Sequence, residues 1–270
     1  MSRAASRPFR PLTGHLCEPN APIGFFSDHP EFHGASVDTT LNPSVRDLSS
    51  EVRAQIAHNC CAHVLGEVLY VDAGARGVPI PFPSVSALYA GAQLEIRPRE
   101  PLRDEGSSLN AMIAWCRRRG VTTEERYPEI PENVTAIPYD DVFRAQAVGL
   151  VKDASQLPDG PGSADAVESV LRRRRACTIA FVVDQAFEDI GTRIYSAPGG
   201  LRRGSHAMAC VEMYLVPDAT RQRGFVRIFI IKNSWGTTHA DDGYVHLHED
   251  FVEEHTYAKL VVDHGPNGIV

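Results

Sequence analysis

The segment IIKNSWGTTHADDGY, residues 230–244, is the stretch that most restricts the fold of this 270-residue chain. The β-rich run FVRIFIIKN leads into it, and the run GYVHLHE follows it. Alternation and β-branched residues predict a strand on each side, so Asn233 ends a strand, and Asp241 and Asp242 form a turn before Gly243. An amide in such a position can accept a hydrogen bond from an imidazole and fix its tautomer without adding charge.

Three further runs in the second half of the chain predict strands. They are ACTIAFVV at 176–183, HAMACVEMYLV at 206–216 and AKLVVD at 258–263. The run ADAVESVLRRRR, residues 164–175, predicts a helix directly before the first of these strands.

The first half of the chain has helical patterns instead. From about residue 50 to residue 72 the pattern is helical and ends strongly apolar, which predicts a buried helix. SVSALYAGA predicts a short helix capped by Ser84, and SSLNAMIAWCRRRG predicts a helix capped by Ser107 or Ser108 and ended by Gly120. Helices followed by strands predict an α+β fold with two layers that meet at a cleft.

Composition and charge argue against several kinds of partner. The formal net charge is -7, which disfavours a nucleic-acid partner held mainly by phosphate contacts. No window of about 18 apolar residues occurs, so we expect no transmembrane helix and no membrane partner. Residues 1–16 lack the apolar run of a secretory signal, which favours a cytoplasmic protein. Residues 1–45 are rich in Pro, Ser, Gly, His and Asn and predict an extended arm.

The six cysteines are sparse and form no CxxC pair, so a zinc site is not expected and free thiols are. His246 and His248 share one strand face, but two imidazoles without a third ligand do not predict a metal. We therefore predict no metal and no cofactor.

The chain holds the three groups that thiol catalysis needs. Cys60 and Cys61 open the buried helix, where the helix dipole lowers the pKa of a thiol. His206 begins a strand and can act as a base, and Asn233 can orient its ring. The separations are 146 residues from Cys60 to His206 (206 minus 60) and 27 from His206 to Asn233 (233 minus 206).

Several segments together resemble a known family. HAMACVEMY followed by KNSWGTTHADDGY resembles the His and Asn segments of papain-like cysteine peptidases. DEGSSLNAMIAWCRRRGVTTEERYP, residues 104–128, resembles the middle stretch of that family. The Cys-to-His separation falls within the family's range of about 130 to 150 residues. The matches run from about Val52 to Asp263, and the absence of paired cysteines looks like the bacterial members.

The resemblance implies a papain-like fold of two lobes with the active site in the cleft between them. The helical lobe would cover about 46–135 and the antiparallel β-barrel-like lobe about 136–270. It also implies a cysteine peptidase that cleaves a peptide or protein substrate through a thioester acyl-enzyme. One of the paired cysteines would be the nucleophile, His206 the general base and acid, and Asn233 the residue that orients it.

The resemblance implies further roles around these three residues. Gln55 would donate to the oxyanion, Trp235 would shield the His–Asn hydrogen bond, and Gly106 would offer its backbone to an extended substrate. The specificity pocket would be lined by Ser107, Ser108 and Ala207.

Two alignments of the cysteine segment compete. CCAHVLGEVLY fits the family pattern with Cys60 as the nucleophile, whereas the family's Gln-to-Cys spacing of six is kept only by Cys61 (61 minus 55). A loop absorbs one residue more easily than a buried helix rotates by about 100°, which favours Cys60.

The sequence departs from the family pattern at two places. No Trp follows either cysteine, and His239 and Ala240 stand where the family has its second Trp and a Gly. Two alternatives therefore stay open, an acyl transferase or peptide ligase on the same fold, and a non-catalytic peptide-binding protein. The oligomeric state is also open.

Overall fold

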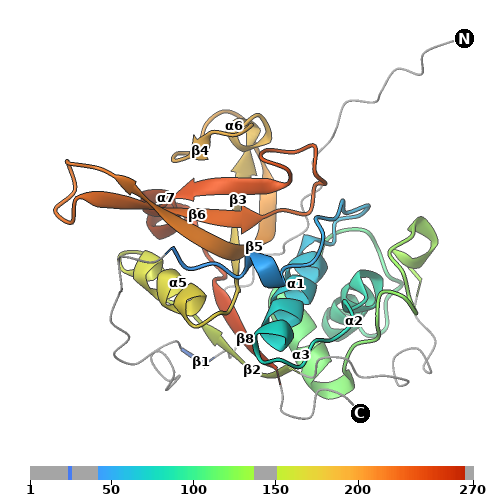
Figure 1. Ribbon diagram of the computed structural model, residues 1–270. Helices are drawn as coiled ribbons and strands as arrows, with labels where there is room; N and C mark the ends of the chain where they lie inside the picture. The colour runs from blue at the N-terminus through green and yellow to red at the C-terminus, as the bar shows by residue number, and fades with distance from the viewer. Residues whose placement is uncertain (1–23, 26–41, 137–150, 265–270) are drawn as a thin grey trace, which may run out of the picture.

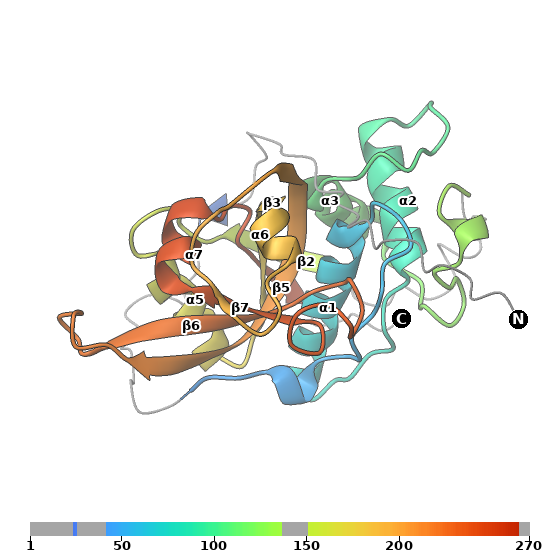
Figure 2. The same ribbon diagram turned by 90° about the horizontal axis from the view of Figure 1, so that it is seen from above.

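The computed structural model describes residues 24–25, 42–136 and 151–264 (Figure 1). Three helices stand to one side of a five-stranded sheet, and two views at right angles show the same separation (Figures 1 and 2). Most of the predicted arm, residues 1–45, lies outside the described residues, as does the segment 137–150 at the predicted lobe boundary. The combination of helices and mostly antiparallel strands confirms the α+β prediction.

Three helices build the first half of the chain. They are α1 (Cys60–Ala75), α2 (Val85–Ile96) and α3 (Leu109–Arg119). Two short 3-10 helices flank them, η3 (Arg46–Leu48) and η4 (Pro131–Asn133). The Ser84 hydroxyl accepts from the third N–H of α2 at 3.0 Å, and the Ser108 hydroxyl does the same for α3 at 3.4 Å. Gly120 ends α3 with a positive φ of 75°. These contacts confirm the predicted caps, with Ser108 rather than Ser107 at α3.

The first helix begins later than the sequence pattern predicts. The helical pattern starts near residue 50, whereas α1 starts at Cys60, where the two cysteines were expected to open the buried helix. The preceding residues pair with the NSWG segment instead, because the Gln55 N–H donates to the Ser234 carbonyl at 2.7 Å and the Gly236 N–H donates to the Arg53 carbonyl at 3.0 Å. Long-range backbone pairing therefore overrides the local helical pattern here.

The main sheet contains four of the five strands predicted in the second half of the chain, together with the short strand β4, which was not predicted. In spatial order they are β3 (Cys177–Asp184), β5 (Arg202–Pro217), β6 (Phe225–Lys232), β7 (Tyr244–His248) and β4 (Ile194–Tyr195). The first four are antiparallel, and β4 is parallel to β7. The long strand β5 pairs with β3 along its first half and with β6 along its second half, with a register shift between Cys210 and Glu212. Such a shift bends a strand, so one strand serves two neighbours.

A smaller sheet contains β1 (Gly24–Phe25), β2 (Val151–Gln156) and β8 (Leu260–His264). The strand β8 matches the predicted run AKLVVD, pairs antiparallel with β2 and contacts α1. The strand β2 was not predicted, because VKDASQ has one β-branched residue and no alternation. Its partner, more than one hundred residues away, stabilises it as a strand.

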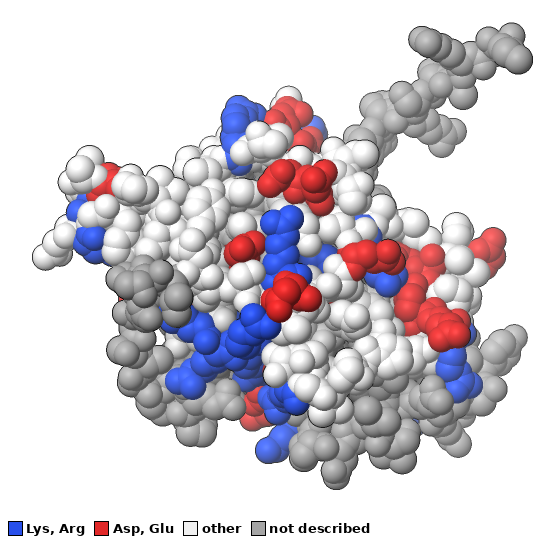
Figure 3. All heavy atoms as spheres, in the orientation of Figure 1, with Lys and Arg blue, Asp and Glu red and all other residues white. Residues whose placement is uncertain are grey.

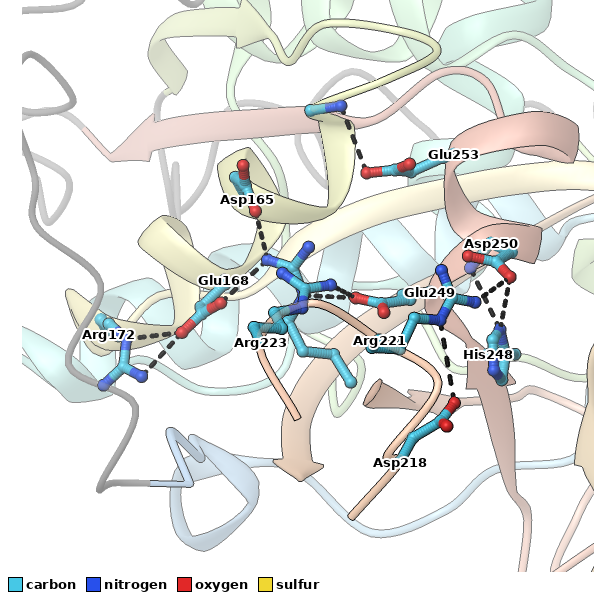
Figure 4. A network of polar contacts seen from close by, with 12 residues as sticks. Asp165, Glu168, Arg172, Asp218, Arg221, Arg223, His248, Glu249, Asp250 and Glu253 are labelled. Atoms are coloured by element: carbon cyan, nitrogen blue, oxygen red, sulfur yellow. Dashed lines mark hydrogen bonds and ion pairs between the residues drawn. The ribbon is translucent and has the colours of Figure 1, made fainter. Parts of the chain in front are cut away.

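Short helices cover the sheet, namely α5 (Ser163–Arg172), α6 (Gln185–Glu188) and α7 (Glu249–His255). Arg227 on β6 joins two of them, since its guanidinium lies 3.0 Å from Glu168 on α5 and 2.7 Å from Glu249 on α7. Figure 4 shows both carboxylates converging between these elements. The side chains of all three residues are nearly fully buried, so this network ties β6, α5 and α7 together.

The described end of the predicted arm runs along the sheet. The Met213 N–H donates to the Pro43 carbonyl at 3.0 Å, and the Val45 N–H donates to the Val211 carbonyl at 2.8 Å. Residues 43–45 therefore add backbone hydrogen bonds to β5.

Both signs of charge are interspersed on the face shown in Figure 3. Two arginine runs, residues 117–119 and 172–175, lie at or just after the ends of α3 and α5, and in them Arg117 and Arg174 form surface ion pairs with Asp153 at 2.6 Å and Asp47 at 2.8 Å. Arg175 differs, because its buried guanidinium pairs with Asp72. That residue belongs to the core and not to a basic surface.

Candidate active site

Cys60 is the first residue of α1 and is fully buried. Residues at the start of a helix have N–H groups without intrahelical acceptors, and the positive end of the helix dipole favours a thiolate there. Burial of the Cys60 thiol raises its pKa, but interactions with the Cys61 thiol, the His206 ring and the Ala207 N–H outweigh burial, and the pKa lies well below its ordinary value. The site therefore favours the nucleophilic form of this thiol.

Cys61 has the opposite environment. Its thiol donates to the Ser107 carbonyl at 3.4 Å. Burial and the neighbouring Cys60 hold the pKa of the Cys61 thiol well above its ordinary value. The surroundings thus favour the thiolate form of Cys60 and the neutral thiol form of Cys61. The five cysteines in the described part of the chain are all free thiols.

His206 lies on β5, opposite Phe181 of β3, and its ring is fully buried. Its Nε2 lies 2.7 Å from Oδ1 of Asn233. Among the described residues no group makes a hydrogen bond of standard geometry to its Nδ1. Since Nε2 is occupied by the amide, Nδ1 is the nitrogen left for the Cys60 thiol, whose pKa the ring lowers. The sheet thereby brings His206 and Asn233 to the N-terminus of α1.

Asn233 directly follows β6, and its amide is held at both ends. Oδ1 accepts from the Ser234 N–H at 2.8 Å as well as from His206. Nδ2 lies 3.2 Å from Nδ1 of His239. Trp235 stacks on the His206 ring, with centroids 4.7 Å apart and planes at 25°. The indole therefore covers the imidazole next to its bond with the amide.

Gln55 lies beside this segment and is mostly buried. Its Nε2 donates to the Ala57 carbonyl at 2.7 Å, and its Oε1 accepts from the Ser234 hydroxyl at 2.6 Å. The residue before it, Ala54, forms a bridge with Trp235. Gln55 is thus tied to the Asn233 segment by its backbone and its side chain.

Of the residues predicted to bind substrate, Ser107 contacts Cys61 and Ala207 contacts Cys60. Gly106 has φ of 93°, a conformation that favours glycine, and its N–H donates to the Tyr89 hydroxyl at 3.0 Å. Ser107 is buried and bonds Cys61 through its carbonyl, whereas the Ser108 hydroxyl caps α3. Ala207 is buried, and its N–H interacts with the Cys60 thiol.

Sequence reasoning missed a carboxylate that holds the start of α1. Glu129 accepts from the Asn59 amide at 2.7 Å and from the Ile56 N–H at 3.3 Å. Its second oxygen lies 3.0 Å from Nε2 of His63, one turn after Cys60. Burial raises the pKa of Glu129, but His63 and Asn59 outweigh it and the net shift is downward. The only sequence signal for this loop is that Tyr127 and Pro128, which precede Glu129, end the segment that resembles the family's middle stretch.

No group of three or more His, Cys, Asp or Glu side chains within the described residues could hold a metal ion. Within the same ranges, no helix is both long and apolar enough to span a membrane.

The fold and site define a thiol-dependent hydrolase, and comparison with known proteins identifies the family. The family described as papain family cysteine protease matches residues 104–262, more than half of the chain. The chain therefore belongs to the papain family of cysteine proteases, which are hydrolases. The match includes His206 and Asn233 but starts after Cys60. No curated protein sequence matches the chain.

Solved structures agree in fold at low identity. Xylellain, a cysteine protease from Xylella fastidiosa, is 16% identical, with 96% of this chain and 98% of that chain covered and a TM-score of 0.74. Procathepsin B S9 from Trypanosoma congolense is 13% identical, with 94% and 87% covered and a TM-score of 0.68. The bromelain protease from Ananas comosus, in complex with the E64 inhibitor, is 16% identical, with 84% and 99% covered and a TM-score of 0.63. These likenesses confirm the papain-like fold prediction.

Proposed function

We propose that this protein hydrolyses peptide bonds in peptide or protein substrates, with Cys60 as nucleophile, His206 as general base and acid, and Asn233 as the residue that orients His206. One observation supports this most directly. A thiol with a depressed pKa stands at a helix N-terminus beside an imidazole whose Nε2 is bound by an amide at 2.7 Å. A thiolate and an imidazolium side by side are net neutral, so a buried site can hold both.

In the proposed first step the Cys60 thiolate attacks the substrate carbonyl carbon and forms a C–S bond. The carbonyl oxygen gains negative charge, and two donors lie nearby to receive it. Cys60 is the first helical residue, so its N–H has no acceptor within α1. Gln55 Nε2 would supply the second hydrogen bond. The C–N bond then breaks, and the proton on His206 Nδ1 goes to the leaving amine.

In the second step water replaces the amine. His206, now neutral, removes a proton from water, and the resulting hydroxide attacks the thioester carbon. The C–S bond breaks, the carboxylic acid leaves, and the thiolate forms again beside His206, which holds the proton taken from water. Trp235 keeps water away from the His206–Asn233 bond during both steps, because its ring stacks on the imidazole.

The substrate would lie extended against Gly106, whose carbonyl can accept a hydrogen bond in the manner of an added strand, since its N–H donates to the Tyr89 hydroxyl. A pocket between the end of α2 and the loop before Gly106 opens beside this residue, lined in part by Gln93, Arg97 and Leu102. Ser107, Ser108 and Ala207 would form the wall nearest the nucleophile.

A thiol-directed epoxide probe tests this function. We expect the probe to label the unmodified protein once, on Cys60, and to block peptide hydrolysis. Cys61→Ala should keep the label and Cys60→Ala should lose it. Equal labelling of the two variants, or no label on the unmodified protein, would contradict the proposed nucleophile. Adding a high concentration of a primary amine separates hydrolysis from acyl transfer, since transfer would give an amide product of higher mass.

A further inference from the structure

His239 is part of the polar chain that runs through the site, although the family has a Trp at its position. The side chain is buried, with 8% of its surface exposed. Its ring packs edge-on against Trp235, with centroids 4.7 Å apart and planes at 82°, and it lies 5.6 Å from the ring of Phe187. An indole there could fill the same space, but it lacks a ring nitrogen able to accept a hydrogen bond. The substitution therefore adds an acceptor beside Asn233.

The backbone identifies which end of the Asn233 amide is oxygen. The Ser234 N–H, which can only donate, lies 2.8 Å from Oδ1 of Asn233. The other end of the amide must then be the NH2 group, and it points at Nδ1 of His239 at 3.2 Å. A donor that faces a ring nitrogen requires a lone pair on that nitrogen. Nδ1 of His239 is therefore unprotonated, and the ring hydrogen is on Nε2.

The surroundings of His239 favour this neutral tautomer. Burial lowers the pKa of His239 to about 4, against an interaction with the Phe187 carbonyl that raises it, and the His206 charge lowers it further. The ring is thus neutral near pH 7. The Phe187 carbonyl raises the pKa of the ring, as a carbonyl does where it faces a ring N–H, and this agrees with Nδ1 as the nitrogen that carries the lone pair.

We infer that His239 is a positioning residue, whose Nδ1 lone pair holds the Asn233 amide with Oδ1 toward His206. With Oδ1 in this place, Nε2 of His206 carries hydrogen and Nδ1 is available to the Cys60 thiol. A rotated amide would present NH2 to Nε2, which disfavours both the required tautomer and the imidazolium. This inference rests on the proposed function, because the orientation matters to the rate only if His206 acts as base and acid.

Two substitutions of similar shape distinguish the effect of the Nδ1 acceptor of His239 from the effect of its aromatic ring. His239→Asn can place an amide oxygen near the position of Nδ1, whereas His239→Leu has a comparable branch without an acceptor. Both remove the ring contact with Trp235. We expect His239→Leu to lower kcat about 10-fold with KM nearly unchanged, since one buried hydrogen bond is lost, and His239→Asn to retain most of kcat. Equal kcat for the two variants would overturn the inference.

A measurement on the unmodified protein avoids any failure of the variants to fold. Ring 15N and 1H shifts at pH 7 report the tautomers of both histidines directly. We expect hydrogen on Nε2 of His239, and a hydrogen-bonded Nε2–H on His206 that is kept in His239→Asn and broadened in His239→Leu. Hydrogen on Nδ1 of His239 would overturn the inference. If the protein shows no peptide hydrolysis, the proposed function fails, but these shifts still decide the role of His239.

Discussion

Nζ of Lys232 on β6 lies 2.7 Å from Oε2 of Glu67 on α1, and both side chains are at most 6% exposed. Lys232 also donates to the carbonyl and the hydroxyl of Ser50, each at 2.7 Å. Because Lys232 immediately precedes Asn233, this ion pair joins the helix that begins at Cys60 to the strand that leads into Asn233. Burial lowers the pKa of Lys232, and Glu67 acts against that shift.

Breaking this pair on one side should destabilise the fold strongly. Lys232→Met leaves the Glu67 carboxylate buried without its cation, which costs about 3–5 kcal/mol in comparable cases. Chemical denaturation should show this loss in the free energy of unfolding. The double variant Glu67→Leu with Lys232→Met should recover most of it, and a double variant as unstable as Lys232→Met alone would contradict a loss that comes from the unpaired charge.

The reactivity of the thiol toward iodoacetamide should persist well below pH 8.5, the ordinary value for a thiol. The contact with the Cys61 thiol is the largest influence that lowers the pKa of Cys60, while burial raises it. Cys61→Ala should therefore move the acid limb of the alkylation rate to higher pH. Cys61→Ser keeps an O–H donor and should leave that limb close to that of the unmodified protein. Identical limbs in the two variants would show that Cys61 does not support the thiolate.

Replacement of Glu129 should loosen the start of α1. Glu129→Gln removes the charge that receives hydrogen bonds from Asn59 and His63, and charge-assisted bonds contribute about 1.5–3 kcal/mol. The pKa of Glu129 is depressed in the folded protein, so its stabilising effect is present above the unfolded value and is lost as pH falls through the folded value. The unfolding free energy of Glu129→Gln should thus fall less steeply than that of the unmodified protein below about pH 4.3. If the unfolding free energies of the two proteins fell equally with pH, the Glu129 charge would not stabilise the start of α1.

Arg227 should be the least replaceable of the arginines that pair with Glu168 and Glu249, two carboxylates labelled in Figure 4. Its guanidinium is 3% exposed and holds Glu168 and Glu249, whose side chains are each 2% exposed. Arg227→Met should cost at most about 3–5 kcal/mol, because two buried carboxylates are left with only the more exposed Arg172 and Arg223 as partners. Arg221→Met is the matched control, since Arg221 pairs with Asp250 nearer the surface, where exposed pairs contribute about 0–1 kcal/mol. Similar losses for the two variants would contradict the importance of burial.

Local patterns predicted much of the architecture. The apolar runs of β3, β5, β6, β7 and β8, and the serine caps of α2 and α3, depend on neighbours within a few residues. Two predictions depended on distant contacts and differed from the structure. The helix predicted from residue 50 begins at Cys60, and β2 was missed, because both segments take their conformation from partners more than one hundred residues away.

In the candidate site, too, some features follow from local sequence and others depend on distant contacts. The NSWG segment and its spacing from His206 were enough to identify the family and the types of residue involved. The motif is contiguous in the sequence, so it can be read without knowledge of the tertiary contacts. The difference between Cys60 and Cys61 depends on which thiol meets the His206 ring and which meets the Ser107 carbonyl. The contacts of His239 and Glu129 likewise arise where α1, β5 and the NSWG loop pack together. Hydrogen bonds and desolvation act through space, so residues far apart in the chain set these protonation states.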